Sequence, residues 1–176
     1  MNIKQNITLL GMAIILLPAL ASADSWFGKK GVAPVTNELY KTECSACHYP
    51  YQPGLLPARS WEKMLTNLDK HFGEDASVSP KDQQELLSYA TQNAADKSDH
   101  KRSVKINRSI NNNETPLRIT EVKYIIRKHH ELSNKHVKNN PQVKSLSRCQ
   151  ACHTRIDSGS FSEREIKIPG IGSWED

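Results

Sequence analysis

The four cysteines of the chain lie in two short stretches that share one pattern. Residues 44–48 read Cys-Ser-Ala-Cys-His and residues 149–153 read Cys-Gln-Ala-Cys-His, so a histidine directly follows each pair of thiols. Thiols about one helical turn apart can form thioethers with the two vinyl groups of a haem, and the adjacent imidazole can reach the iron from the same side. The pattern therefore predicts two covalently attached c-type haems. The predicted attachment residues are Cys44, Cys47, Cys149 and Cys152, and the predicted proximal iron ligands are His48 and His153.

Other kinds of site use the same cysteine spacing. Two Cys-x-x-Cys motifs can bind one zinc ion, and a single motif can form a redox dithiol. Neither site needs a histidine directly after each pair, and the chain lacks the βαβ pattern that accompanies thioredoxin-like motifs. The spacing also suits none of the three disulfide pairings that four cysteines allow. We therefore interpret both motifs as haem attachment sites.

An iron that His48 binds on one side has a second axial position to fill. After the first motif, the proline-rich stretch 49–57 is expected to be a loop over the haem. A predicted helix then begins at Ser60, and its apolar face ends at His71. We favour His71 as the second ligand. Met64 on the same face is the alternative, because His/Met ligation is common in cytochromes c, although methionine inside an apolar face more often serves as packing.

The second motif is preceded by a predicted helix that begins at Thr120 and has one apolar face. His129 continues that face, whereas His130 is rotated about 100° further round toward solvent. His136 lies about two turns beyond His129 and is a further alternative. We therefore expect His129 to be the second ligand of the iron that His153 binds.

The first 23 residues have the layout of a cleaved secretory signal. A lysine near the start is followed by an apolar run from Ile7 to Leu20 and by Ala21-Ser22-Ala23 before Asp24. The apolar run is shorter than the roughly 20 residues that span a bilayer, so cleavage is expected rather than anchoring. Export suits a c-type cytochrome, because its haem is attached outside the bacterial inner membrane. The sequence therefore predicts a periplasmic protein.

The mature chain has the length of one small domain and few residues with which to build a core. Only 37% of all residues are hydrophobic and 6% are aromatic. Haem is a large and mostly apolar body, and packing around it can replace much of a hydrophobic core. We predict a mostly α-helical c-type cytochrome with long irregular loops, in which residues 24–96 and 116–176 form the haem-binding segments and residues 97–115 a polar linker. The tail is expected to lie over the second haem with Phe161, Ile166, Ile168 and Trp174.

The formal net charge of the chain is +5. A surplus of this size keeps a protein soluble, and it favours an acidic partner or peripheral association with an anionic membrane surface. Lysines gather in residues 97–115, where they are either solvated or form a docking patch for a redox partner. An exported chain without a recognition motif is not expected to bind nucleic acid. Catalytic nucleophiles, carboxylate pairs and phosphate-binding loops are not recognisable, so an enzyme is not predicted.

Further stretches make the chain resemble the bacterial dihaem cytochrome c family. With the two cysteine motifs, they are Leu55-Leu56-Pro57, Ser60-Trp61, His71-Phe72-Gly73, Arg118-Ile119-Thr120, Arg127-Lys128-His129 and Ile168-Pro169. The resemblance covers nearly the whole mature chain. It implies two low-potential haems with bis-histidine ligation, His48 with His71 and His153 with His129. It also implies electron exchange with a small c-type haem protein or a b-type membrane cytochrome.

The predicted function is outer-sphere electron transfer. An iron saturated by two imidazoles changes oxidation state without binding a substrate, and histidine in place of methionine lowers its reduction potential. The alternative is a haem enzyme or gas sensor, similar to a peroxidase or binding oxygen or nitric oxide, in which one iron has an open axial position. The occupancy of the axial positions distinguishes the two functions.

Overall fold

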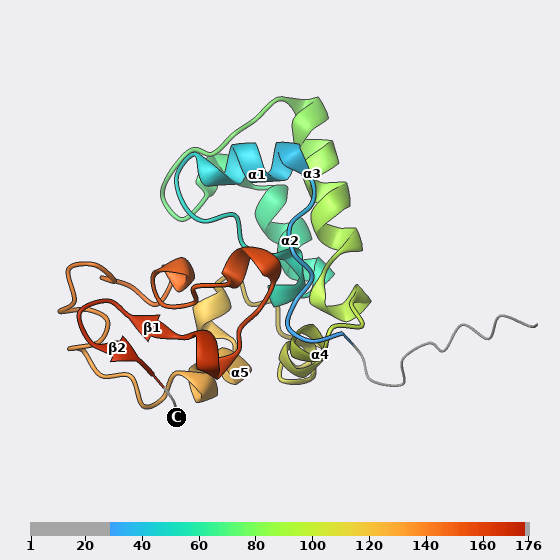
Figure 1. Ribbon diagram of the computed structural model, residues 1–176. Helices are drawn as coiled ribbons and strands as arrows, with labels where there is room; N and C mark the ends of the chain where they lie inside the picture. Colours follow the sequence, from blue (N-terminus) through green and yellow to red (C-terminus); the bar gives the residue numbers. More distant parts are fainter. Residues whose placement is uncertain (1–28, 175–176) are drawn as a thin grey trace, which may run out of the picture.

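The computed structural model describes residues 29–174, and the predicted signal sequence, residues 1–23, lies outside the described residues. Short α-helices joined by long irregular segments make up most of this range (Figure 1). The predicted mostly α-helical class is therefore confirmed. The α-helices are α1 (Glu38–Ser45), α2 (Ala58–Leu65), α3 (Pro80–Gln92), α4 (Lys101–Arg108) and α5 (Lys123–Lys128), and the antiparallel strands are β1 (Lys167–Ile168) and β2 (Gly172–Ser173).

Single turns of 3₁₀ helix occur between these elements and are most frequent in the C-terminal part, where the chain folds with little other regular structure. Turns of this kind satisfy backbone groups locally in segments too short for an α-helix. They are η1 (Pro53–Leu55), η2 (Leu68–Lys70), η3 (Ala95–Lys97), η4 (Ile119–Glu121), η5 (Cys149–Ala151), η6 (Ile156–Ser158) and η7 (Glu163–Glu165).

The helices divide into two groups that share one core. Figure 1 shows α1, α2 and α3 together in one part of the molecule and α5 with the two strands in the other. α1 and α2 pack against α3, and α4 packs against both η3 and α5. α4 therefore joins the N-terminal helices to the C-terminal part of the chain.

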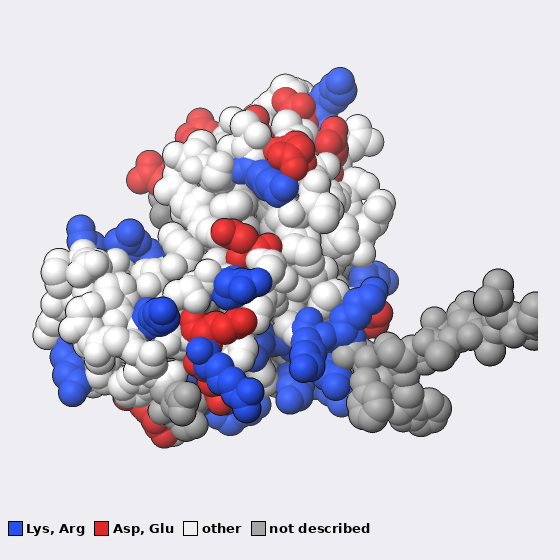
Figure 2. Space-filling model, in the orientation of Figure 1, with Lys and Arg blue, Asp and Glu red and all other residues white. Residues whose placement is uncertain are grey.

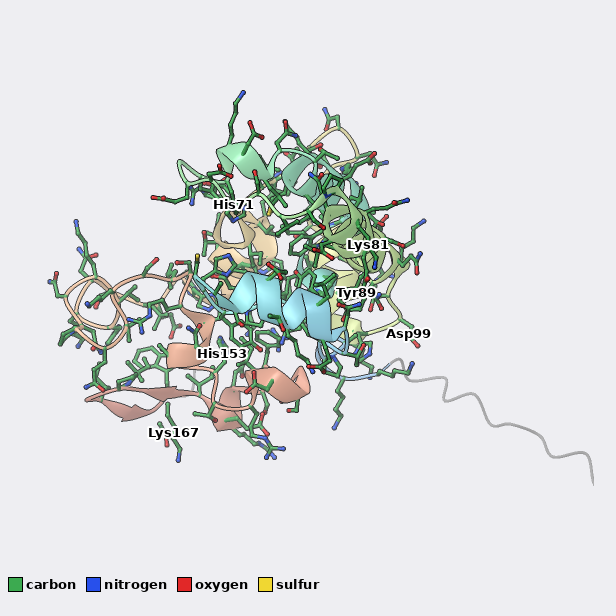
Figure 3. The ribbon with its side chains drawn as sticks, turned by 90° about the horizontal axis from the view of Figure 1, so that it is seen from above. His71, Lys81, Tyr89, Asp99, His153 and Lys167 are labelled. Carbon is green, nitrogen blue, oxygen red and sulfur yellow. The ribbon has the colours of Figure 1, made fainter. Side chains whose placement is uncertain are left out.

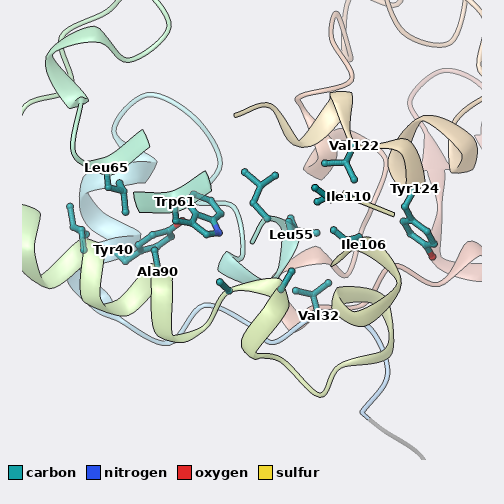
Figure 4. Close-up of a cluster of buried hydrophobic side chains, with 14 of the residues drawn as sticks. Val32, Tyr40, Leu55, Trp61, Leu65, Ala90, Ile106, Ile110, Val122 and Tyr124 are labelled. Carbon is teal, nitrogen blue, oxygen red and sulfur yellow. The ribbon is translucent and has the colours of Figure 1, made fainter. Parts of the chain in front are cut away.

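A continuous cluster of buried apolar side chains runs between the two groups (Figure 4). Tyr40 and Trp61 pack edge to face at its N-terminal end, with ring centroids 6.4 Å apart. The indole Nε1–H of Trp61 donates to the carbonyl of Pro53 at 2.7 Å, so its one polar group is satisfied inside the core. Leu55 and Leu56 are fully buried in the same cluster, so this end of the stretch 49–57 packs into the core.

The starts of the helices agree only in part with the sequence prediction. The Ser79-Pro80 pair is typical of a helix start, and α3 begins there, with Ser79 accepting from the backbone N–H of Asp82. α2 begins at Ala58, two residues before the predicted start at Ser60, and the N–H of Ala58 donates to the carboxylate of Asp96 at 2.7 Å. The cap of α2 is thus supplied by a residue far along the chain, which the local sequence does not reveal.

The stretch 97–115, predicted as a polar linker, contains α4. Ile106 of this helix is 0% exposed and lies in the central core, and Ser103 is equally buried. The polar composition reflects the outer face of a short amphipathic helix. The expectation of a solvated linker is therefore corrected, because this stretch is part of the packed structure.

The described chain begins with an extended segment that contacts the C-terminal part. The N–H of Val32 donates to the carbonyl of Gly159 at 3.0 Å. Gly159 has a φ of +73°, and a Cβ at this position would overlap the carbonyl of Val32. A glycine is therefore required where the first described residues cross the segment that follows the second motif.

Candidate haem sites

The first cysteine motif lies at the end of α1. Cys44 is in the last turn of the helix and is half-buried, whereas Cys47 and His48 follow the helix and are exposed. The N–H of His48 reaches the carbonyl of Cys44, so the motif continues the helical path for one more turn. Both thiols and the imidazole are consequently presented on one short segment, as haem attachment requires.

His48 lies directly beside the predicted second ligand of the first site. The rings of His48 and His71 are close to parallel, at 20°, with centroids 6.0 Å apart. Two imidazoles that bind one metal from opposite sides, each at about 2.0 Å, hold their centroids about 6 Å apart. The geometry of this pair therefore fits a shared iron.

His71 is held in position by a tight turn. Its carbonyl accepts from the N–H of Glu74 at 3.1 Å, and the central residues Phe72 and Gly73 have φ values of +55° and +101°. Positive φ at both central positions is the signature of a type I′ turn. The guanidinium of Arg118 lies 4.2 Å from the centroid of the Phe72 ring. His71 therefore projects from a turn beyond α2 and η2, rather than from the end of the predicted helix.

The second motif occupies η5, where the N–H of His153 donates to the carbonyl of Cys149 at 2.9 Å. His129 caps the C-terminal end of α5, and its ring centroid lies 6.0 Å from that of His153. The two rings are close to perpendicular, at 77°. Figure 3 shows the two sites apart from each other, with His71 in the turn after α2 and His153 in the C-terminal segment.

A mostly apolar cavity surrounds the second pair of histidines. Its volume is about 1100 Å³ when the space at its open mouth is included. His129, His153, Cys149 and Cys152 all line it. Its other walls include α5, Arg102 of α4 and, as predicted, the C-terminal tail. The tail residues that line the cavity are Phe161, Ile166, Ile168 and Trp174.

The alternative ligands lie elsewhere or have the wrong hydrogen bonds. Met64 packs against the hydrophobic core, and His130 is exposed beside Glu131. His136 is only 5% exposed and lines the cavity, but its Nδ1 accepts from the backbone N–H of Ser133 at 3.0 Å. Its proton is therefore on Nε2, which leaves no lone pair there for a metal. The structure thus brings His129, and not His130 or His136, next to His153.

One histidine in each pair is oriented by a backbone carbonyl. Nδ1 of His48 lies 2.7 Å from the carbonyl of Tyr49, and Nδ1 of His129 lies 2.8 Å from the carbonyl of Ile125. A carbonyl only accepts, so the Nδ1 atom carries the proton and Nε2 keeps its lone pair. Metal-binding histidines are typically fixed in this way. Nδ1 of His71 and Nδ1 of His153 are buried without a partner among the described residues.

The electrostatics of the sites disfavour charged thiols and imidazoles. Burial raises the pKa of Cys44 to about 12, with a smaller effect of Glu43, and burial raises the pKa of Cys149 to about 11. A redox dithiol needs an accessible thiolate and therefore a lowered pKa. Burial followed by the neighbouring His48 lowers the pKa of His71, so its imidazole is neutral, as an iron ligand must be.

Among residues 29–174, no group of three or more His, Cys, Asp or Glu side chains is placed to hold a metal ion. A four-coordinate zinc site is thus not formed by the described residues. Two histidines are sufficient for an iron that a porphyrin already holds. The paired imidazoles, the paired cysteines of each motif and the apolar cavity of the second site all fit haem.

Two tyrosines connect the sites, and no sequence motif indicates this connection. The ring of Tyr51 stacks on His48 with centroids 5.1 Å apart, and its hydroxyl donates to the carbonyl of Ser147, two residues before Cys149. The hydroxyl of Tyr49 donates to Asp157 at 2.9 Å. The segment after the first motif is therefore tied to both sides of the second motif.

A protein-family model for dihaem cytochrome c matches residues 40–161, which include both cysteine motifs and all four paired histidines. The chain belongs to the dihaem cytochrome c family. The family assignment made from the sequence is thereby confirmed, and so are its cofactors. This dihaem cytochrome c carries two covalently bound c-type haems, one at each Cys-x-x-Cys-His motif.

Solved structures of two bacterial proteins are similar to this dihaem cytochrome c. A diheme cytochrome c from Shewanella baltica OS155 is 36% identical, with a TM-score of 0.66 over 79% of this chain and 98% of that one. A diheme cytochrome c from Rhodobacter sphaeroides is 42% identical, with a TM-score of 0.66 over 74% of this chain and 100% of that one. A search of curated proteins found no match.

Membership of the family has consequences for function and location. Dihaem cytochromes c are generally electron carriers rather than enzymes, and they are typically exported. This chain is accordingly an electron-transfer cytochrome. Within residues 29–174, none of the helices has the length and apolar character needed to cross a bilayer.

Proposed function

We propose that this protein is a periplasmic electron carrier whose two haems are both ligated by two histidines. The observation that carries the proposal is the 6.0 Å separation of ring centroids in each histidine pair. His48 and His71 would hold one iron, and His153 and His129 the other. Each haem, when bound, takes up or releases one electron at its iron without binding a substrate.

The hydrogen bonds of the histidines support this ligation. The carbonyls of Tyr49 and Ile125 orient the rings of His48 and His129 and keep each Nε2 atom free for iron. A carbonyl acceptor also makes the imidazole more basic, which favours the oxidised metal. Two imidazole ligands also favour oxidised iron, because a methionine thioether in place of one imidazole would favour ferrous iron. Both effects favour low reduction potentials.

The surface supports a charged docking site for a redox partner. Figure 2 shows Lys and Arg side chains gathered around the region of α4, whereas Asp and Glu are more frequent over α1 and α3. Lys105 and Arg108 of α4 lie with Arg127 and Lys128 of α5 around one shallow surface hollow. Lys128 also lines the cavity of the second site. A basic surface beside a haem would steer an acidic partner toward it.

The partner classes proposed for this surface are a small c-type haem protein and a b-type membrane cytochrome. Location in the periplasm rests on the predicted cleaved signal at residues 1–23 and on the exported character of c-type cytochromes. A basic surface is also suited to peripheral association with an anionic membrane. Nucleic acid is not proposed as a partner.

An absorption spectrum of the purified holoprotein tests the axial ligation. We expect low-spin spectra in both oxidation states, with no change when carbon monoxide is added to the reduced protein. High-spin bands, or rapid carbon monoxide binding by the native protein, would instead show an open axial position. That result would replace electron transfer with the haem enzyme or gas-sensor function.

A further inference from the structure

Arg102 extends from α4 to the wall of the second haem cavity, which also includes His129 and His153. Its Nη1 donates to the hydroxyl of Tyr124 at 3.1 Å, and its Nη2 donates to the carbonyl of Phe161 at 2.8 Å. Its Nε is buried and has no partner among the described residues. The guanidinium is therefore fixed in place, and its Nε–H donates to none of the described residues.

The charge of Arg102 is not compensated by a neighbouring carboxylate. None of the ion pairs among residues 29–174 includes this arginine. Lys128 lines the same cavity but is paired with Glu163 at 2.6 Å. Arg148 also lines it but is exposed, so solvent screens its charge. Arginine stays ionised in proteins, and the cavity wall thus carries a permanent positive charge at Arg102.

The field of this charge reaches the proximal histidine. The ring of Phe161 lies between the two groups, with its centroid 5.1 Å from that of His153 and 5.6 Å from Cζ of Arg102. One aromatic ring therefore separates the guanidinium of Arg102 from the predicted iron ligand.

We propose that Arg102 raises the reduction potential of the second haem above that of the first. The inference rests on the proposed function, because it assumes two haems with the same pair of axial ligands. An oxidised haem carries one more positive charge than a reduced haem, so a fixed cation favours the reduced state. The effect is stronger beside a mostly apolar cavity than it is in bulk water. The first electron taken up by the oxidised protein then resides on the second haem.

The charge described at the first site is of a different kind. His48 is exposed, and Arg118 stacks on Phe72, the residue after His71. The side chain of Arg118 is 54% exposed, and its Nε lies 3.7 Å from the carboxylate of Glu121. Its charge is both compensated and screened by solvent. The two sites therefore differ in their electrostatics more than in their ligands.

A redox titration of the holoprotein followed by EPR tests the proposal. The two haems are expected to give different low-spin signals, because the angle between the two imidazole planes is 20° at the first site and 77° at the second. In Arg102→Gln, the redox equilibrium of the second haem should change about tenfold toward the oxidised state. For a one-electron couple, this change lowers the midpoint potential by about 59 mV. The first haem should be unaffected. Arg102→Lys should keep most of the wild-type potential, and Arg108→Gln, an exposed position on the same helix, should keep all of it.

The wild-type titration is a test in itself and does not depend on how well a variant folds. If the first haem is reduced before the second, the proposal is wrong. It is equally wrong if Arg102→Gln shifts neither potential, or shifts both by the same amount. Failure of the proposed function would be recognised differently, by a high-spin ferric signal in the wild-type protein.

Discussion

The imidazole planes of His129 and His153 are close to perpendicular, at 77°, whereas those of His48 and His71 are close to parallel, at 20°. The relative orientation of two axial imidazoles sets the energies of the two iron d orbitals that interact with the ligand π systems. Perpendicular planes make these orbitals nearly equal in energy, and parallel planes separate them. The two sites therefore differ electronically although the proposed ligands are the same.

The first prediction is that the oxidised holoprotein gives two low-spin EPR signals of equal intensity. The parallel pair at the first site should give a rhombic signal, and the perpendicular pair at the second site should give a strongly anisotropic signal with a large maximum g value. Continuous-wave EPR near liquid-helium temperature measures both. Two identical rhombic signals would show that the ring planes at the second site are not perpendicular.

The second prediction concerns the distal ligands. His129→Gly should leave the second iron with an open axial position, so that half of the haem becomes high-spin and binds carbon monoxide when reduced. His71→Gly should do the same at the first site. Carbon monoxide titration followed by absorbance measures the fraction of haem that binds.

The neighbouring histidines are matched controls for these variants. His130→Gly removes an exposed ring next to His129, and His136→Gly removes the ring that packs against Trp174 with centroids 4.8 Å apart. Neither should produce carbon monoxide binding. If His136→Gly, rather than His129→Gly, opens the second haem, the ligand assignment at that site is wrong.

The chemistry of the sites was largely predictable because its signals are local in sequence. The cysteines and proximal histidines form contiguous motifs. The apolar face of one short helix indicates His129 rather than His130 as the ligand, because only His129 continues that face. α5 nevertheless begins at Lys123 and not at Thr120, which lies in η4. The side of the helix that His129 occupies is unaffected by this difference, because Ile125, one turn before His129, lines the same cavity, whereas Ile126 is exposed.

The features that the sequence did not reveal depend on contacts between distant segments. Asp96 caps α2 through Ala58, which is 38 residues away in the chain. Arg102 reaches the second haem cavity from a stretch whose polar composition indicated a linker. Neither side chain belongs to a motif, and only the packing of α4 against η3 and α5 brings them to their positions. Composition identifies solvent-facing residues of a short helix but not the few that point inward.

The third prediction concerns the turn that holds His71. Gly73 has a φ of +101° and open space around the position of a Cβ. Gly73→Ala should therefore cost about 1 kcal/mol of folding free energy through backbone strain alone, without a steric clash. Gly73→Asn should cost less, because asparagine tolerates positive φ better than alanine. Urea unfolding followed by circular dichroism measures the difference, and equal stability of the two variants would contradict the assigned turn.

The fourth prediction concerns Tyr51, which links the two sites. Burial raises its pKa to about 12 from an ordinary value near 10. A raised folded-state pKa means that the protonated phenol is favoured by folding. The stability that this group contributes is therefore fully present below about pH 10 and is lost as the pH rises toward about 12.

Tyr51→Phe should remove this contribution while keeping the ring that stacks on His48. The lost hydrogen bond to Ser147 should cost about 1 kcal/mol at neutral pH. The variant should also lose less stability than the wild type between about pH 9 and pH 12. Urea unfolding at neutral pH measures the cost of the lost hydrogen bond, and urea unfolding at about pH 9 and pH 12 measures the alkaline loss of stability. If the variant loses as much stability as the wild type between these two pH values, Tyr51 is not the group responsible.

The fifth prediction concerns the basic surface formed by α4 and α5. The double variant Lys105→Glu with Arg108→Glu should slow oxidation of the reduced protein by the anionic oxidant hexacyanoferrate(III), because the surface would repel rather than attract it. At about 0.01 M ionic strength the rate should fall several-fold, and the difference should disappear near 1 M, where the Debye length is about 3 Å. The matched control, Lys63→Glu with Lys81→Glu, makes the same change of net charge on α2 and α3. If both variants slow the reaction equally in stopped-flow measurements, net charge alone is responsible and α4 is not the docking surface.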